Sequence, residues 1–306
     1  MMLRSTVDAP SHSRMASVNN CERHYFLRYV RGLESPEQFA PAYMGSALHV
    51  GLEVFHRTGD KEAAIAGLHG YWGPQRFFGD WDWVTPGHAE VILKNYMDAK
   101  HAQDWNVVKL RWADLDSQRL IDTDVQEDAD GFLMLAEASF IVDVPGLGPV
   151  LIKPDILLRV ATGLRVGDHK STTSYLGSKL YNRTKFEHQL RTYALAMGAL
   201  LKEPVGEGFC NAIYAGKSAG FDKFSGKRFE SYVFDYSPAD FTETKAWYKA
   251  SKIKMQTLAA LGMQDELQAP QNPSDRCGYC DFAKLCSAPA ALRPGLVRMH
   301  YKEKAA

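Results

Sequence analysis

The chain has 306 residues, of which 45% are hydrophobic, and its 36 basic residues balance 36 acidic ones. This composition supports a packed core and excludes a disordered chain and a non-specific polycation, although a neutral protein can still carry a local basic groove. No stretch reaches the length of an apolar membrane span and the first residues lack a secretory signal, so we expect an intracellular protein that does not contact membranes.

The first third of the sequence predicts helices, because apolar and aromatic residues recur there at helical spacing. The middle changes to short runs of Val, Ile, Leu and Phe interrupted by Gly or Pro, which predicts strands joined by tight turns. The expected helices cover 21–33, 45–57, 88–105, 184–203 and 237–261, and the expected strands cover 131–144, 149–160, 164–171, 208–215 and 227–236.

This order predicts an α/β or α+β fold with one central mixed β-sheet flanked by helices. We expect three segments that form one compact unit. They are an N-terminal helical region at 1–130, a core at 131–262 and a cysteine-containing tail at 263–306.

Two carboxylates and a lysine converge in the predicted strands. Asp168 and Lys170 lie two residues apart and so point to the same face, with His169 opposite. If the strands pair as a hairpin, Asp155 comes level with them. Paired carboxylates favour Mg²⁺ or Mn²⁺, and a lysine beside them suits metal-assisted hydrolysis of a phosphodiester. The alternative is that Asp155 begins a turn while Asp168 and Lys170 form a surface ion pair.

Two predicted helices offer further groups to this cluster. His49 can join the two aspartates, and Glu53, four residues later on the same helix face, can orient it. Gln189 and Tyr193 also stand four apart, and they can hydrogen-bond a phosphate and stack on a base. The alternatives are a structural histidine and a tyrosine that lies half in the core.

Three of the five cysteines lie in "RCGYCDFAKLC" near the C-terminus: Cys277, Cys280 and Cys286. Three thiolates leave a tetrahedral metal site one ligand short. Cys210 lies inside a strand pattern, where a cysteine behaves as a small buried hydrophobe. Cys21 begins the first helix, and as a ligand it would tie that helix to the C-terminal tail.

Six motifs then follow one another in an order that carries a resemblance. They are Cys21 before an aromatic and basic helix, Gly45-x3-His49, Pro154-Asp155, Asp168-x-Lys170, Gln189-x3-Tyr193 and the C-x2-C-x5-C tail. The chain resembles the RecB-like, iron–sulfur branch of the PD-(D/E)xK nuclease superfamily, which includes CRISPR-associated adaptation nucleases and phage exonucleases.

The resemblance implies a restriction-endonuclease-like core whose termini are joined by a metal-cluster clasp. It implies catalytic residues Asp155, Asp168 and Lys170, and a Mg²⁺ or Mn²⁺ ion held by His49, Asp155, Asp168 and the backbone carbonyl of His169. It further implies a [4Fe–4S] cluster on Cys21, Cys277, Cys280 and Cys286. Structural Zn²⁺ on the same thiolates is the alternative, and we favour the cluster because one ligand stands alone far upstream.

The resemblance also implies that Gln189 and Tyr193 contact DNA. Basic residues that flank this predicted helix are further candidates for phosphate contacts: Arg183, Lys185 and Arg191. The "GKS" at 216–218 lacks the upstream glycine of a P-loop, so we expect no ATP-driven motor.

We therefore expect a metal-dependent DNA exonuclease that acts on DNA ends or single strands in recombination, repair or phage DNA processing. Its expected location is the cytoplasm of a bacterial or phage-infected cell. The alternative is a DNA-end-binding or processing subunit of a CRISPR-adaptation or recombination complex, whose cleavage depends on partner proteins. A third hypothesis is a zinc-stapled binding module without catalysis.

Overall fold

The chain forms two compact units in the computed structural model. The structure describes residues 9–35, 37–74, 76–77, 80–99, 105–123, 125, 127–133, 138–174, 176–220, 227–261 and 269–303. Unit 1 comprises Met1–Ala40, Pro74–Asp80 and Ala246–Ala306, and unit 2 comprises Pro41–Gly73 and Trp81–Lys245. The division into three segments at 130 and 262 stays a prediction.

Unit 2 contains two β-sheets. The larger is mixed and has the order β10–β9–β8–β7, with β8 parallel to β9 and the outer pairs antiparallel. The smaller is antiparallel and has the order β4–β5–β6. The strands are β4 (Leu120–Thr123), β5 (Phe140–Val144), β6 (Gly148–Ile152), β7 (Ile156–Val160), β8 (Gly163–Thr172), β9 (Val205–Tyr214) and β10 (Phe229–Asp235).

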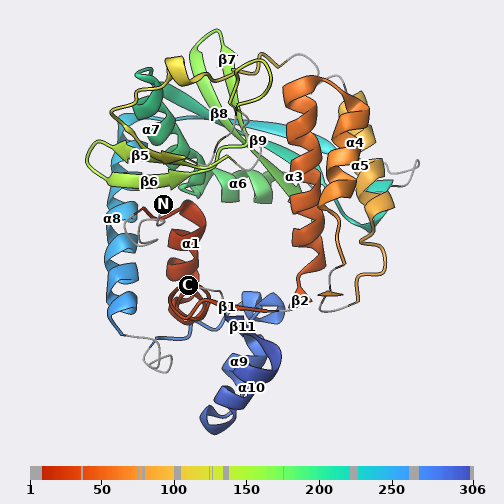
Figure 1. The fold of residues 1–306 in the computed structure, drawn as a ribbon, viewed down its shortest axis with the longest axis vertical. Helices are drawn as coiled ribbons and strands as arrows, with labels where there is room; N and C mark the ends of the chain where they lie inside the picture. The colour runs from red at the N-terminus through yellow and green to blue at the C-terminus, as the bar shows by residue number, and fades with distance from the viewer. Residues whose placement is uncertain are drawn as a thin grey trace. The chain divides into compact units, whose positions relative to one another are not determined.

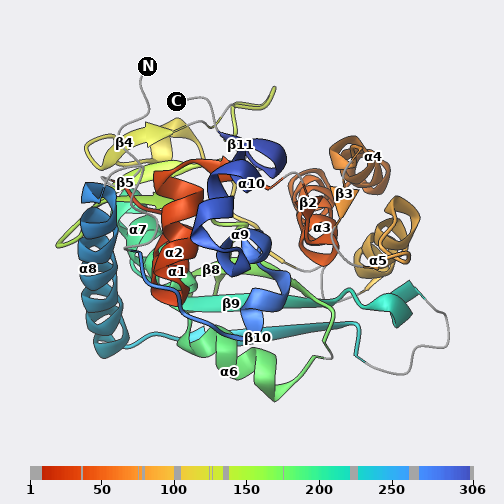
Figure 2. The same cartoon turned by 90° about the horizontal axis from the view of Figure 1, so that it is seen from below.

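Helix α7 (Gln189–Leu201) packs between these sheets, against β8 and β9 on one side and β5 and β6 on the other (Figure 1). It is buried on several sides, as expected for a helix enclosed by two apolar surfaces. Helix α6 (Ser178–Phe186) runs beside β9 and β10 (Figure 2), and the Tyr181 ring contacts those of Tyr232 and Phe234. The remaining helices of unit 2 are α3 (Ala40–Thr58), α4 (Lys61–Tyr71), α5 (Pro86–Asp98), and the short turns η3 (Trp112–Asp114) and η4 (Lys217–Gly220).

The predicted mixed α/β fold with a mixed sheet is confirmed, but the strands form more than one sheet, and the single strand expected over 149–160 is wrong. That segment breaks between Ile152 and Ile156 into β6 and β7, which belong to different sheets. Pro154 lies at the break and has no N–H to donate to a strand ladder. The helix expected over 184–203 also divides, because Glu187 adopts an extended conformation and ends α6. Of the strand expected over 131–144, residues 134–137 lie outside the described residues.

Unit 1 joins the two ends of the chain. Leu27 and Leu33 form a buried cluster with Phe282, Leu285 and Val297. Its elements are α1 (His12–Asn20), α2 (Glu22–Tyr25), the π-helical turn η1 (Phe26–Val30), β1 (Leu33–Glu34), β2 (Glu37–Gln38), β3 (Arg76–Phe77), most of α8 (Pro238–Ala260), η5 (Asp275–Tyr279), α9 (Ala283–Ser287), η6 (Ala290–Leu292), α10 (Arg293–His300) and β11 (Lys302–Glu303). Within the described residues, no helix is both long enough and apolar enough to cross a bilayer.

Candidate active site

The predicted hairpin of β7 and β8 is present and aligns the two aspartates. Ile156 pairs with Gly167, so Asp155, directly before β7, stands level with Asp168. Asp168 is only 4% exposed, and its Oδ2 lies 2.8 Å from Nζ of Lys170. Asp168 and Lys170 share one face of β8, as the alternation of a strand requires. The carboxylates and the ammonium predicted to converge therefore meet at one end of the hairpin.

Helix α3 brings His49 to the same place. Its Nδ1 lies 3.3 Å from Oδ2 of Asp155, which also accepts a 2.7 Å hydrogen bond from the backbone N–H of His169. Gly45, one turn earlier, lets the helix approach β8, because a Cβ there would fall 2.5 Å from Oγ of Ser171. A larger residue at this position would require the Ser171 hydroxyl to move.

Glu53 does not make the predicted contact with His49. Within the described residues, neither an ion pair nor a hydrogen bond joins the two side chains, and Oε1 of Glu53 is buried without a hydrogen-bond partner. Glu53 instead lines a cavity together with Asp155. The carboxylate that orients His49 is therefore Asp155.

Gln189 links Asp168 and Lys170 instead of pointing into solvent. Its Nε2 donates to Oδ1 of Asp168 at 2.9 Å and to the hydroxyl of Tyr193 at 3.1 Å, while Nζ of Lys170 donates to its Oε1 at 2.7 Å. Tyr193 is only 6% exposed. Both ends of the Gln189 amide are thus engaged, and this geometry supports a role in holding Asp168 and Lys170. The DNA contacts predicted for Gln189 and Tyr193 stay predictions.

The environment shifts the pKa values of these groups in different directions. Burial, reinforced by Asp155, raises the pKa of Asp168 to about 6 in spite of Lys170. Burial opposes ionisation of Asp155 as well, but His49 and the N–H of His169 lower its pKa overall. Burial alone would lower the pKa of His49, yet the Asp155 carboxylate raises it. The carboxylate of Asp155 is therefore held ionised, while that of Asp168 can carry a proton near neutral pH.

The donor set suits a hard divalent cation, because it offers two carboxylates, an imidazole and a backbone carbonyl. Among the described residues, however, no three His, Cys, Asp or Glu side chains are arranged as a ready metal site. His49 faces Asp155, whereas Asp168 faces Lys170 and Gln189. The ligand types fit Mg²⁺ or Mn²⁺, and binding requires these side chains to exchange present partners for the ion.

Sequence reasoning missed a buried polar network behind the site. Asn211 on β9 lies opposite His169, and its Nδ2 is 2.7 Å from Nδ1 of His169 and 2.9 Å from the hydroxyl of Tyr96. The same hydroxyl lies 3.0 Å from Nε2 of His56, whose ring stacks on His169. His56 follows His49 by seven residues, two helical turns along one face, so the spacing could have revealed it.

The three basic residues predicted to contact phosphate lie in different environments. Arg183 is 65% exposed and pairs with Glu187, while Lys185 is exposed beside the ring of Tyr181. The Arg191 side chain is only 6% exposed, and its guanidinium lies 2.9 Å from the carboxylates of both Asp240 and Glu243. A buried, doubly paired guanidinium is unsuited to a DNA phosphate, so this geometry contradicts the contact predicted for Arg191.

Replacing Arg191 with alanine should lower the free energy of unfolding by about 2 kcal/mol, because two charge-assisted hydrogen bonds to carboxylates are lost. Urea unfolding measures this loss. Arg183→Ala is the matched control and should change stability by less than about 0.5 kcal/mol, because exposed ion pairs contribute little. Equal losses in the two variants would contradict the structural role of Arg191.

The four cysteines of the predicted cluster all belong to unit 1. Cys277 is exposed, whereas Cys21, Cys280 and Cys286 are half-buried. Burial, with smaller contributions from neighbouring Cys286, Asp281 and Cys21, raises the pKa of Cys280 to about 11. Burial also raises the pKa of Cys286, with Cys21 adding to the effect and Arg23 opposing it. The upstream cysteine thus lies close enough to act electrostatically on two thiols of the tail.

Protein contacts already hold these two ends together around the cysteines. The backbone N–H of Arg23 donates to the carbonyl of Pro270 at 3.0 Å, and Arg28 pairs with Asp281 at 2.8 Å. The ring of His24 packs edge-on against Phe282. The described residues do not include a set arranged to bind a metal here either. Backbone, ion-pair and ring contacts therefore join the two ends of the chain around the cysteines.

Comparison with known proteins assigns the chain to a family. The sequence profile of the PD-(D/E)XK nuclease superfamily matches residues 9–287, which includes both the candidate site and all five cysteines. The chain belongs to this superfamily, whose members are nucleases that typically use Mg²⁺ or Mn²⁺. A search of curated proteins found no match.

Proposed function

We propose that this chain is a metal-dependent DNA exonuclease of the RecB-like, iron–sulfur branch that acts on DNA ends or single strands. The observation that carries the proposal is the convergence of Asp155, Asp168 and Lys170 on one hairpin in a chain of this superfamily. Recombination, repair or phage DNA processing in a bacterial cytoplasm is the setting that we propose for it.

Each residue of the site has a distinct part in the proposed reaction. His49, Asp155, Asp168 and the carbonyl of His169 would hold the ion, which would supply Lewis-acid stabilisation of the phosphate. Lys170 holds the attacking water, and its positive charge stabilises the charge that develops on the phosphate. Water attacks phosphorus, the bond to the 3′-oxygen breaks, and the products are a 5′-phosphate and a 3′-hydroxyl. Gln189 holds the side chains of Lys170 and Asp168 in position through its hydrogen bonds to both.

Digestion of end-labelled DNA tests this function directly. Single- and double-stranded oligonucleotides carrying the label at either end are incubated with the protein and Mn²⁺ or Mg²⁺. Progressive shortening from one end, absent in EDTA, is the expected result, and the label position reports the polarity. Closed circular single strands are the control, because an exonuclease leaves them intact. Wild-type protein that cuts none of these substrates, alone or with a partner, would overturn the proposal.

One observation favours a second candidate function, in which cleavage depends on a partner. Both proposed carboxylate ligands are engaged by neighbouring side chains, Asp155 by His49 and Asp168 by Lys170 and Gln189. A DNA-end-processing subunit of a CRISPR-adaptation or recombination complex fits such a resting state. Protein that binds DNA ends tightly but cuts them only after a partner protein is added would favour this function over the first.

Replacing Gln189 with alanine should lower the cleavage rate at saturating DNA by about ten- to a hundredfold, as loss of a group that orients metal ligands does. The Mn²⁺ concentration needed for half-maximal activity should rise in parallel. A side chain that only contacts DNA would instead raise KM and leave the metal requirement unchanged. Tyr193→Phe is the matched control. It removes only the hydroxyl that accepts from the Gln189 amide and leaves the contacts of that amide with Asp168 and Lys170, so it should change the rate by only a few fold.

We further propose that Cys21, Cys277, Cys280 and Cys286 hold a [4Fe–4S] cluster that fastens the two ends of the chain. Thiolates bind metal, so the half-buried thiols must lose protons when the cluster forms. Cys21→Ser should lose most of the bound iron and the visible absorbance of anaerobically purified protein. Cys210→Ser, at a buried cysteine of β9, is the control and should retain both. Zinc in place of iron in the wild type would favour the structural-zinc alternative.

A further inference from the structure

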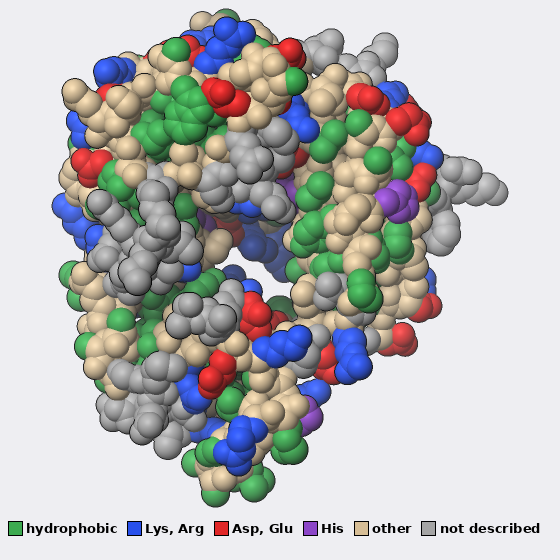
Figure 3. All heavy atoms as spheres, in the orientation of Figure 1, with side chains coloured by type: hydrophobic (Ala, Val, Ile, Leu, Met, Phe, Trp, Pro, Cys, Tyr) green, Lys and Arg blue, Asp and Glu red, His purple; other side chains and the backbone are tan. Residues whose placement is uncertain are grey.

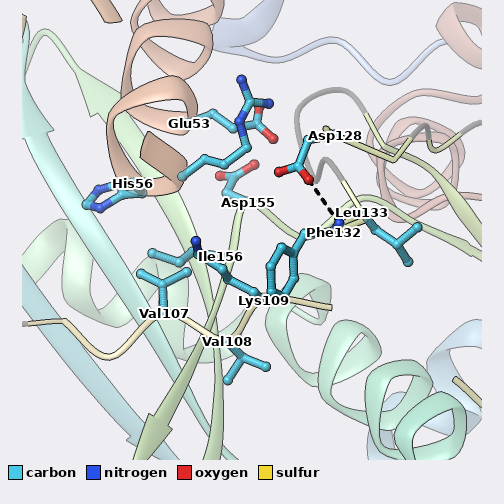
Figure 4. Close-up of a pocket in the computed structure, with 11 residues that line it drawn as sticks. Glu53, His56, Val107, Val108, Lys109, Asp128, Phe132, Leu133, Asp155 and Ile156 are labelled. Carbon is cyan, nitrogen blue, oxygen red and sulfur yellow. Dashed lines mark hydrogen bonds between the residues drawn. The ribbon is translucent and has the colours of Figure 1, made fainter. Parts of the chain in front are cut away.

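A small cavity opens beside Asp155 and has not been given a role above. Its volume is about 40 Å³, and its lining includes Glu53, Lys109, Asp128 and Phe132 together with Asp155. Figure 4 shows the carboxylates of Asp155 and Asp128 and the ring of Phe132 around this space. A cavity of this size accommodates a few water molecules or part of a phosphate group, but not a nucleobase.

The wall of this cavity is formed by two irregular segments that extend the larger sheet beyond β7. The backbone N–H of Val108 donates to the carbonyl of Leu157 at 2.8 Å, and that of Leu133 donates to the carbonyl of Leu110 at 2.9 Å. Oδ1 of Asp128 accepts the N–H of Phe132 at 2.9 Å and so fixes the turn that presents this ring. Backbone pairing with the catalytic hairpin therefore sets the position of the wall.

Two cations lie against the Phe132 ring. Nζ of Lys109 is 5.0 Å from the ring centroid, and Cζ of Arg111 is 4.2 Å from it. Lys109 and Arg111 are two residues apart in an extended segment, so their side chains leave the same face. An aromatic ring holds a cation in place by its quadrupole and leaves the positive charge unneutralised.

The charges of Lys109 and Arg111 are not neutralised by an acidic partner among the described residues. Within the described residues, neither Lys109 nor Arg111 has a side-chain ion pair, whereas Arg119 pairs with Asp143 and Arg159 with Glu203. Figure 3 likewise shows acidic and basic side chains interspersed on the visible surface. Asp128 carries negative charge into the cavity, but backbone N–H groups engage its carboxylate. Burial and Asp155 raise the pKa of Glu53 to about 7 in spite of Arg57, so this side chain carries only part of a negative charge at neutral pH.

We propose that Lys109 and Arg111, held by Phe132, bind a phosphate of the DNA strand next to the one that is cut. The inference rests on the proposed function, because it takes Asp155 as part of the cleavage site. Lys109 and Arg111 lie against the Phe132 ring, which lines the same cavity as Asp155. They can therefore hold the strand while the neighbouring linkage is hydrolysed. Phosphate contacts of this kind position a strand without reading its sequence.

Salt-dependent binding of a fluorescently labelled single-stranded oligonucleotide in EDTA tests the two cations. Each loss of a phosphate contact lowers the slope of log K against log salt by about 0.7 for single strands. Because both cations bind the same phosphate, the double variant should lower the slope by this full amount, and Lys109→Ala and Arg111→Ala should each lower it by part of that amount. Arg159→Ala is the matched control, because that residue lies on neighbouring β7 at similar exposure but is neutralised by Glu203. An unchanged slope in the double variant would overturn the inference.

Neutral linkages in the DNA locate the phosphate. One methylphosphonate at a time replaces the phosphates of the oligonucleotide, and binding is compared between wild type and the double variant. At one internal position, the methylphosphonate should weaken binding by the wild type about as much as the two substitutions do. At that position it should not weaken binding by the double variant any further. If the phosphate whose replacement affects the wild type but not the double variant is instead a terminal 5′- or 3′-phosphate, the site holds a strand end. If every replacement weakens binding by the wild type and by the double variant equally, the phosphate site is refuted.

These binding measurements separate the two proposals. They need no cleavage, so a chain that binds through Lys109 and Arg111 but never cuts DNA would refute the proposed function and keep the phosphate site. A chain that degrades DNA with Mn²⁺, but whose double variant shows wild-type KM and wild-type salt dependence, would refute only the phosphate site. Both cations lie at the surface, and thermal unfolding checks that the variants remain folded.

Discussion

Replacing Lys170 with alanine should lower metal-dependent DNA cleavage by about a hundred- to a thousandfold, the loss expected when one preorganised charge at a developing anion is removed. Lys170 donates to Gln189 and lies 2.8 Å from Asp168, so its ammonium is held in one position before substrate arrives. Burial alone would lower its pKa, but Asp168 raises it, and the side chain stays charged. The rate of a single turnover with end-labelled DNA measures the effect.

The variant should remain folded, although the lysine is a partner of a buried carboxylate. Removing one member of a buried pair is costly when the other keeps its charge. Asp168 has a raised pKa even beside Lys170, so without the lysine it takes up a proton near neutral pH and avoids most of that cost. Lys170→Met preserves more of the packing and serves as the control for volume. Full activity in either variant would remove Lys170 from the proposed mechanism.

The sequence motifs predicted the catalytic hairpin because strand alternation and short turns are local properties. Asp168 and Lys170 had to share a face, and a tight turn between β7 and β8 had to bring Asp155 level with them. The break at Pro154 was not predicted, because a single strand was expected over 149–160. A proline shows that a ladder is interrupted, whereas the sheet that each strand then joins depends on distant partners.

Side-chain partners were predictable only where both members lie on one element. The spacing of Gln189 and Tyr193 placed them on one helix face, but not the engagement of both ends of the Gln189 amide. Arg191 looked like a surface cation because its partners, Asp240 and Glu243, come some fifty residues later. Whether a basic residue is free for DNA is thus decided by tertiary pairing, which charge patterning along the chain does not reveal.

Asp168→Asn should weaken Mn²⁺ binding by about a hundredfold or more and reduce cleavage correspondingly, because loss of a ligand costs more than the 10- to 100-fold typical of groups that only orient one. The substitution preserves shape and keeps an acceptor for the amide of Gln189. It therefore removes the carboxylate charge with little effect on packing. Titration calorimetry with Mn²⁺ measures the affinity, and circular dichroism checks the fold.

The same variant should change the pH dependence of metal binding. In the wild type, protons compete with Mn²⁺ at Asp168, whose pKa is about 6, and at His49, whose pKa is also raised. Affinity should then begin to fall where His49 takes up its proton and fall more steeply as pH drops below about 6, with a limiting slope of about two log units per pH unit, one for each proton. Asp155 contributes no such proton, because its pKa is lowered. The asparagine variant should keep only the slope of one from His49, and an unchanged slope would exclude Asp168 as a ligand.

The free energy of unfolding of the metal-free protein should change with pH in the opposite direction to the metal affinity, because protonation of Asp168 stabilises the fold. The folded pKa of Asp168 lies above its unfolded value, so this group stabilises the metal-free fold fully at low pH, and the contribution disappears as pH rises through about 6. Saturating Mn²⁺ reverses the trend, because the ion binds only the deprotonated carboxylate. Urea unfolding of wild type and Asp168→Asn at pH 5 and pH 7, with and without Mn²⁺, separates these effects. A wild-type difference between the two pH values that persists unchanged in the asparagine variant must originate in another group.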